Sequence, residues 1–124
     1  MLYQMTDDQN KTVLLSIIIP RVVLSLEKDQ ALITHSQLKF SNNYIQIIDG
    51  LIDVLNHEDK LCRKALRQDN IKVSDVLVYA DGVNYVARYK GIRYNRHISS
   101  DVVRVIVSEC ITGKVKVEMF SIYT

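Results

Sequence analysis

The spacing of apolar and polar residues changes near residue 70 of the chain. Before that point apolar residues recur at helical intervals. The longest periodic set comprises Leu38, Ile45, Ile48, Ile52, Leu55, Cys62 and Leu66. From Lys72 onward the period is two, which is typical of half-buried strands. The pattern predicts a helical half over about residues 1–70 and a β-rich half over about residues 71–124.

A first helix is predicted to start at a capping box formed by Thr6 and Gln9. The segment Val13–Leu26 that follows is apolar almost all round, with Pro20 as an expected kink. Because β-branched residues dominate it, two short strands are the alternative. We favour the helix, which would lie in the centre of the fold or in an oligomer interface.

A second helix is predicted after another candidate capping box, Thr34–Gln37. Gly50 weakens its middle, and Asn70 is an expected stop. Its last turns are loaded with the cations Lys60, Arg63, Lys64 and Arg67, which complement the helix dipole. Two long consecutive helices indicate an antiparallel αα-hairpin.

Two sequence signals for tight turns divide the β-rich half into predicted strands. Asp81-Gly82 separates the predicted strands Val76–Ala80 and Val83–Tyr89, and Lys90-Gly91 leads into a third strand, Ile92–Ile98. Pairing Ala80 with Val83, and Tyr89 with Ile92, keeps one face of all three strands apolar. In the first two strands that face comprises Val76, Val78, Ala80, Val83, Tyr85, Ala87 and Tyr89.

The segment 101–112 fits either a helix or a strand. As a helix it would have Ser100 as N-cap and Gly113 after its end; as a strand it would pair with residues 114–122. We favour the helix, with Lys114–Tyr123 as a final strand. The predicted fold is therefore α+β in one domain, residues 1–124: an antiparallel αα-hairpin, a three- to four-stranded antiparallel sheet and one additional helix.

Composition, charge and cysteine spacing exclude several classes of protein. The 124 residues are 48% hydrophobic with a net charge of +2, which excludes intrinsic disorder. The acidic N-terminus is unlike a secretory signal, and the apolar run near Val13 is interrupted before it reaches membrane-spanning length. Cys62 and Cys110 lie far apart, without CxxC spacing. We therefore expect a cytoplasmic protein without a membrane span.

Basic and aromatic residues alternate over residues 85–97. Arg88, Lys90, Arg93 and Arg96 are candidate contacts to an anion or a nucleic acid. The predicted register puts the tyrosines on the apolar face and Arg88 and Arg93 on the other, with Asp75 beside Arg88. Only Arg96 shares the tyrosine face. This separation favours an ordinary half-buried sheet over a base-stacking platform.

The sequence offers only weak evidence for catalytic or metal-binding groups. Asp49, Asp53 and His57 share one helical stripe, but a solvated polar face explains them better than a metal site. Cys62 and Cys110 fall on apolar arcs, where thiols behave as small hydrophobes. No glycine-rich phosphate loop or nucleophile motif is present in the sequence. We expect no enzymatic activity, no cofactor and no small-molecule substrate.

Apolar side chains outside the expected core indicate a partner surface instead. They are Ile17, Ile18 and Val22 of the first helix and Leu77, Tyr79 and Val86 of the outer sheet face. The alternative is a monomer with helices on both sides of the sheet. We predict a small non-catalytic intracellular interaction protein, such as a regulator, adaptor or inhibitor, acting as a homodimer or on another protein. The alternative is a nucleic-acid-binding accessory protein that uses residues 85–97.

Overall fold

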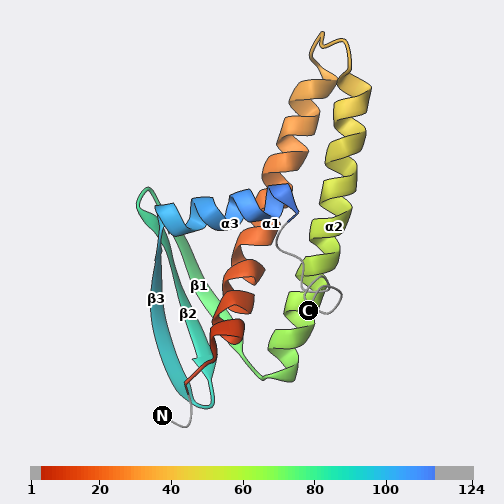
Figure 1. Ribbon diagram of the computed structural model, residues 1–124. Coiled ribbons are helices and arrows are strands. Elements are labelled where there is room, and N and C mark those ends of the chain that lie inside the picture. Colours follow the sequence, from red (N-terminus) through yellow and green to blue (C-terminus); the bar gives the residue numbers. More distant parts are fainter. Residues whose placement is uncertain (1–3, 114–124) are drawn as a thin grey trace.

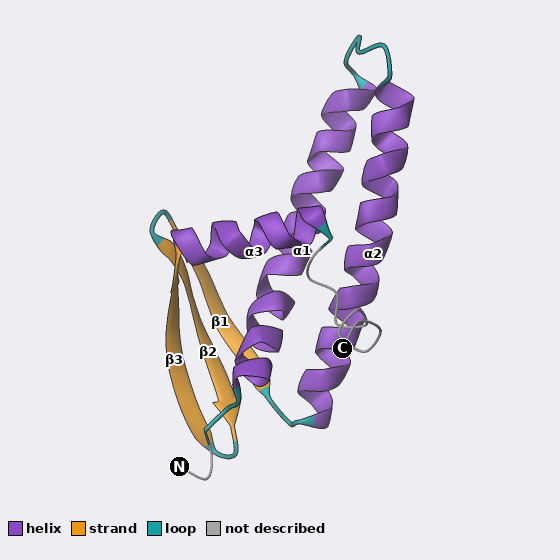
Figure 2. Ribbon diagram, viewed as in Figure 1, coloured by secondary structure: helices purple, strands orange, loops and turns teal. Residues whose placement is uncertain are grey.

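The computed structural model describes residues 4–113 and has the predicted α+β architecture (Figures 1 and 2). Helices α1 (Asp7–Thr34) and α2 (Ser41–Gln68) form a long antiparallel hairpin. Strands β1 (Lys72–Tyr79), β2 (Gly82–Tyr89) and β3 (Ile92–Ser99) form an antiparallel sheet in the order β1-β2-β3. Helix α3 (Ser100–Thr112) leaves the sheet and crosses α1 (Figure 1). The predicted final strand, 114–123, lies outside the described residues.

Helix α1 is the central element of the core. Its start is the predicted capping box: the Thr6 hydroxyl accepts from the Gln9 N–H, and the Gln9 side chain accepts from the Thr6 N–H. Pro20 is accommodated inside one continuous helix, so the two-strand alternative for Val13–Leu26 is wrong. Most of the apolar surface of α1 up to Leu26 is covered because α2, α3 and the sheet surround it, with Val13 and Ile19 fully buried and Leu24 exposed.

Helix α2 begins later than the sequence predicted. Phe40 is its N-cap residue and makes no side-chain cap bond, whereas Thr34 still belongs to α1. The predicted capping box at Thr34–Gln37 is therefore wrong, because the Thr34 hydroxyl bonds back to the Gln30 carbonyl within α1. The helix ends beside Asn70, which has a left-handed φ of 55°.

The sheet register was predicted correctly for β2–β3 and incorrectly for β1–β2. Tyr89 opposes Ile92 as expected. In the first hairpin, however, the turn residues are Ala80 and Asp81, so Tyr79 opposes Gly82. This shift of two residues keeps Val83 and its neighbours on the same face.

A β-bulge in β1 changes which of its residues face the helices. Between the pairs Ser74–Val86 and Leu77–Asn84, residues Asp75 and Val76 oppose the single residue Tyr85. Asp75 has a left-handed φ of 54°. As a result both Val73, opposite Ala87, and Val76 pack towards the core, whereas simple alternation from Val76 would place Val73 on the outer face.

The ambiguous segment 101–112 is helical. The Ser99 hydroxyl, one residue before the predicted cap, accepts from the Val102 N–H, and Gly113 ends α3 with a φ of 74°. The Ser100 N–H also donates to the Asp81 carbonyl at 2.9 Å, which ties the start of α3 to the β1–β2 turn.

Candidate functional site

The distal part of the α1–α2 hairpin projects beyond the rest of the molecule (Figure 1). We call residues 27–54 the arm. All of them are described, and none of them is buried; burial in α1 ends at Leu26 and in α2 resumes at Leu55. Large apolar side chains are nevertheless exposed there, with Leu32 71% and Ile47 69% accessible. The others in or beside the arm are Leu24, Leu38, Phe40 and Tyr44.

The two helices of the arm contact each other partly through polar residues. The Gln30 Nε2 donates to Asp49 Oδ1 and to the Ile45 carbonyl across the two helices. Further down, half-buried Ile48, Leu51 and Ile52 pack on the edge of the core. In the arm, α2 therefore has apolar residues against the core, while Leu32 of α1 and Ile47 of α2 are exposed to solvent.

The six residues predicted as a partner surface separate into two groups. Ile17, Ile18 and Val22 are buried within the single chain, because α2, α3 and the sheet cover α1. Val86 is also buried, although it points to the outer sheet face between Ser74 and Asn95. These four residues offer no surface in this fold. Leu77 and Tyr79 remain exposed, as predicted.

Three cations form a row across the outer face of the sheet. Arg88 of β2 opposes Arg93 on β3, as predicted, and Lys72 on β1. The sequence had placed Asp75 beside Arg88; the bulge and the shifted register put Lys72 there instead. The Arg88 guanidinium donates to the Ser74 hydroxyl at 2.9 Å, and Arg93 donates to Asn95 at 3.2 Å.

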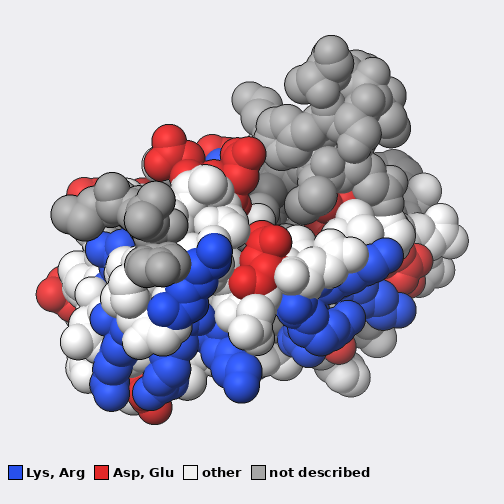
Figure 3. Space-filling view, turned by 90° about the horizontal axis from the view of Figure 1, so that it is seen from below, with Lys and Arg blue, Asp and Glu red and all other residues white. Residues whose placement is uncertain are grey.

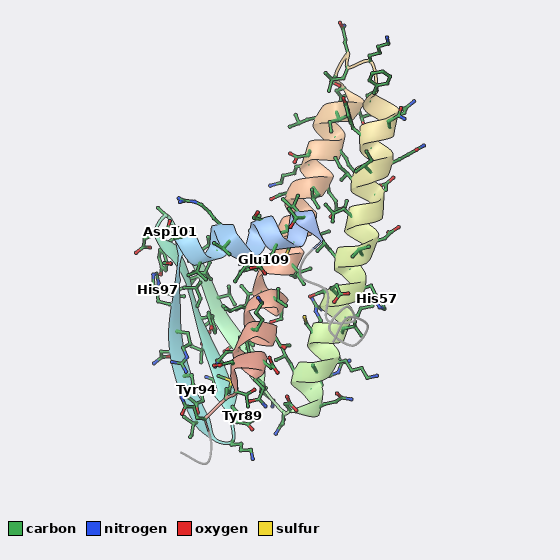
Figure 4. All side chains as sticks on the ribbon, viewed as in Figure 1. His57, Tyr89, Tyr94, His97, Asp101 and Glu109 are labelled. Atoms are coloured by element: carbon green, nitrogen blue, oxygen red, sulfur yellow. The ribbon has the colours of Figure 1, made fainter. Side chains whose placement is uncertain are left out.

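Tyr85, Tyr89 and Tyr94 lie on the other face of the sheet, as expected. Tyr85 is buried, and burial raises its pKa. Tyr89 and Tyr94 are half-buried against the core and lie towards one end of the strands, with His97 further along β3 (Figure 4). Arg96 lies over the Tyr94 ring, 5.0 Å from its centroid, and Lys90 in the β2–β3 turn lies over Tyr89 at 5.6 Å. The four predicted cations are thus divided between two faces and a turn.

A second group of cations surrounds a pocket that the sequence did not reveal. Lys and Arg side chains gather on the face seen from below, over both the sheet and α2 (Figure 3). On the helical side Arg21, Arg63 and Arg67 line a pocket of about 440 Å³ between α1, α2 and β1. Arg63 and Arg67 were noticed only as dipole-complementing residues. The signal that could have found them is a like-charge pair at i,i+4, which is unfavourable in an isolated helix.

The candidate reactive groups lie in unreactive surroundings. Cys62 and Cys110 are free and buried. Burial, helped by Asp59 and Glu58, raises the Cys62 pKa to about 12; burial and Glu109 raise that of Cys110 to about 11. His57 lies on α2, far from His97 on the sheet (Figure 4). Within residues 4–113 no three His, Cys, Asp or Glu side chains are grouped so as to hold a metal ion.

By length and composition α1 could cross a membrane, and no other helix in residues 4–113 meets that test. In this fold 44% of its most apolar window is buried against the rest of the chain. The core helix of a soluble protein satisfies the same criteria. Val13 and Ile19 are fully buried within the chain.

A protein-family model described as YhjD protein matches residues 4–118. The chain belongs to this family. The match includes the arm, the sheet and α3, so the features described above lie within the family's own span. No curated protein and no solved structure matches the chain. The family description states no activity.

Proposed function

We propose that this YhjD-family chain is a non-catalytic intracellular interaction protein whose arm pairs with the arm of a second copy. One observation carries the proposal: residues 27–54 contain no buried side chain, yet they expose large apolar residues such as Leu32 and Ile47. A hairpin of two helices buries only the apolar side chains that lie between the helices. Apolar side chains on its outer faces stay exposed unless a partner covers them. Exposed apolar patches of this kind mark interaction surfaces.

A second copy is the partner that suits the shape of the arm. Two antiparallel helices joined by a short loop are half of a four-helix bundle, and two such hairpins can form the whole. Pairing would cover Leu32 of α1 and Tyr44 and Ile47 of α2. Burying each such side chain stabilises an interface by about 1.5–3 kcal/mol.

The charges of the arm favour an antiparallel arrangement of the two copies. Lys39 lies at the tip of the arm, and Asp49 and Asp53 lie towards its base. In an antiparallel two-fold pair the tip of one arm meets the base of the other. Lys39 of each copy then faces carboxylates of its partner, which sets the register of the contact.

Sedimentation equilibrium from low to high micromolar protein tests the pairing. We expect dimerisation of the wild type and its loss in the variant L32S/I47S. By the burial energies above, each substitution weakens the dimer by roughly tenfold or more. The matched control is Leu77→Ser, which removes an equally large exposed side chain from the sheet. It should dimerise like the wild type.

Two results would count against the arm as the dimer surface. The first is a single species of 14.3 kDa at high micromolar wild-type protein, which is the mass of one chain. The second is a dimer that Leu77→Ser dissociates and L32S/I47S does not. That outcome would assign the contact to the outer sheet face instead.

The chemistry of the thiols supports a non-catalytic, intracellular role. A nucleophilic cysteine has a lowered pKa and an accessible sulfur. Cys62 and Cys110 have raised pKa values and are buried. Free thiols also suit the reducing interior of a cell.

A second candidate function, nucleic-acid binding, is favoured by the row of Lys72, Arg88 and Arg93 on the outer sheet face. If the three cations of this row contact phosphates of a single strand, log K should fall with log[salt] with a slope of about −2. Replacing Arg88 and Arg93 with Gln should reduce that slope and leave the fold intact. No binding at low salt would remove this candidate.

A further inference from the structure

The pocket between α1, α2 and β1 gathers three like charges around an apolar floor. Arg21 comes from α1, and Arg63 and Arg67 come from successive turns of α2. Its volume of about 440 Å³ is in the range of small-molecule sites. Arg21 lies more than forty positions from the other two in the sequence. The fold therefore brings the three guanidinium groups together.

The positive charge of this pocket is mostly uncompensated. Arg63 forms an ion pair with Asp59, with 3.1 Å between Nε and Oδ2. Among the described residues, Arg21 and Arg67 have neither a hydrogen-bond nor an ion-pair partner. Asp59 neutralises one of the three positive charges of the cluster, so two remain. Placing like charges together costs folding free energy, and a bound anion would recover it.

The floor of the pocket is formed by apolar residues of all three elements. Ile17 and Leu66 are buried, and Val73 and Val76 are half-buried. In a regular strand Val73 and Val76 would point to opposite faces. The bulge at Asp75 directs both side chains towards the helices, so it is the bulge that places β1 residues in the floor of the pocket.

From this combination we propose that the pocket binds a phosphate monoester whose organic group is apolar. A phosphomonoester carries close to two negative charges at neutral pH, which matches the excess charge of the cluster. Guanidinium groups bind phosphate oxygens in a bidentate manner. The apolar group would lie against Leu66, Val73 and Val76. This site is separate from both the arm and the outer-face row, because Val73 and Val76 belong to the inner side of the sheet.

Titration calorimetry on the full chain, with phenyl phosphate as the probe, tests the assignment. Inorganic phosphate lacks the apolar group, and benzoate carries one charge less, so both should bind at least roughly tenfold more weakly. The variant R21Q/R67Q removes the two unpaired cations. Because both side chains are exposed, it should melt like the wild type but bind phenyl phosphate roughly a hundredfold more weakly.

The matched control is K60Q/K64Q, which removes the same charge from exposed positions of α2 that do not line the pocket, and should bind phenyl phosphate like the wild type. Equal losses in both double variants would mean a general charge effect and would overturn the site. So would benzoate binding as tightly as phenyl phosphate, or no binding of phenyl phosphate at all.

The same phosphate chemistry could be presented by a soluble metabolite or by a lipid headgroup. Co-sedimentation with phosphatidylcholine vesicles, with and without phosphatidic acid, separates the two sources. Binding to phosphatidic acid that R21Q/R67Q abolishes would assign the lipid. Binding of phenyl phosphate without vesicle binding would assign a soluble ligand. Sedimentation of the arm variant L32S/I47S is independent of both results, so the two proposals can fail separately.

Discussion

Gln30 of α1 donates hydrogen bonds to both Asp49 Oδ1 and the Ile45 carbonyl of α2, at 2.5 and 3.2 Å. Both protons of one amide group are therefore used to join the two helices of the arm. Nearer the sheet, the same two helices are joined through fully buried residues such as Ile19 and Leu55. The contact between the helices thus changes from apolar to polar along the hairpin, which leaves the arm the least stable part of it.

Replacing Gln30 with Ala should loosen the arm without unfolding the protein. The loss of two exposed or half-buried hydrogen bonds costs about 1–2 kcal/mol locally. Amide exchange should speed up within residues 27–54, while the thermal midpoint, which reports the core, stays close to that of the wild type. An unchanged exchange rate in the arm would contradict this role of Gln30.

Two glycines should respond to Ala in opposite directions. Gly50 lies inside α2 with open space around its Cα, so Gly50→Ala should stabilise the helix by about 1 kcal/mol. Gly82 has a φ of 149°, and a Cβ there would lie 1.9 Å from the Ile98 carbonyl oxygen. Gly82→Ala should therefore destabilise the fold by about 2 kcal/mol or more. Urea denaturation of both variants is the measurement, and a shared direction of change would contradict it.

The helices and the second hairpin could be predicted because their signals are local. The Thr6–Gln9 capping box and the Lys90-Gly91 turn each involve residues that are neighbours in the sequence. The first hairpin was placed two residues out, because Asp81-Gly82 signals a turn that in the structure consists of Ala80 and Asp81. The bulge at Asp75 has no local signal in the sequence. The shifted turn and the bulge together changed the partner of Arg88 from Asp75 to Lys72.

Tyr85 and Tyr89 of the sheet should act as core residues. Tyr85 is buried and Tyr89 is half-buried, so Tyr85→Ala should cost about 3–5 kcal/mol of stability and Tyr89→Ala somewhat less, on the order of 3 kcal/mol. Thermal melts of the two variants measure this. A Tyr89→Ala protein that melts like the wild type but loses binding to a nucleic acid would make Tyr89 a stacking residue instead.

Both cysteines should be unreactive in the folded protein. Their folded pKa values, about 12 for Cys62 and about 11 for Cys110, lie above the ordinary value of 9.0. At pH 8 a thiol reagent should modify them only after unfolding. Since the raised pKa favours the protonated folded state, the contribution of the thiols to stability should be constant below pH 9 and fall as the pH rises towards 12. Fast modification of either thiol before unfolding would reopen a redox or catalytic role.

The candidate sites were harder to predict from the sequence than the fold was. The apolar surface of α1 pointed to a partner, but it is the tertiary packing that buries Ile17, Ile18 and Val22 and leaves Leu32 exposed. All four residues look alike in the sequence. The cluster of Arg21, Arg63 and Arg67 likewise depends on the pairing of α1 with α2, which no local pattern reports.

Hydrogen exchange of the wild type at low and high micromolar concentration tests the central claim most directly. If the arm pairs with a second copy, amides within residues 27–54 should become more protected as the concentration rises. The exchange of β1, β2 and β3 should stay the same. Exchange in the arm that is independent of concentration, or protection that appears at Leu77 and Tyr79 instead, would contradict the account.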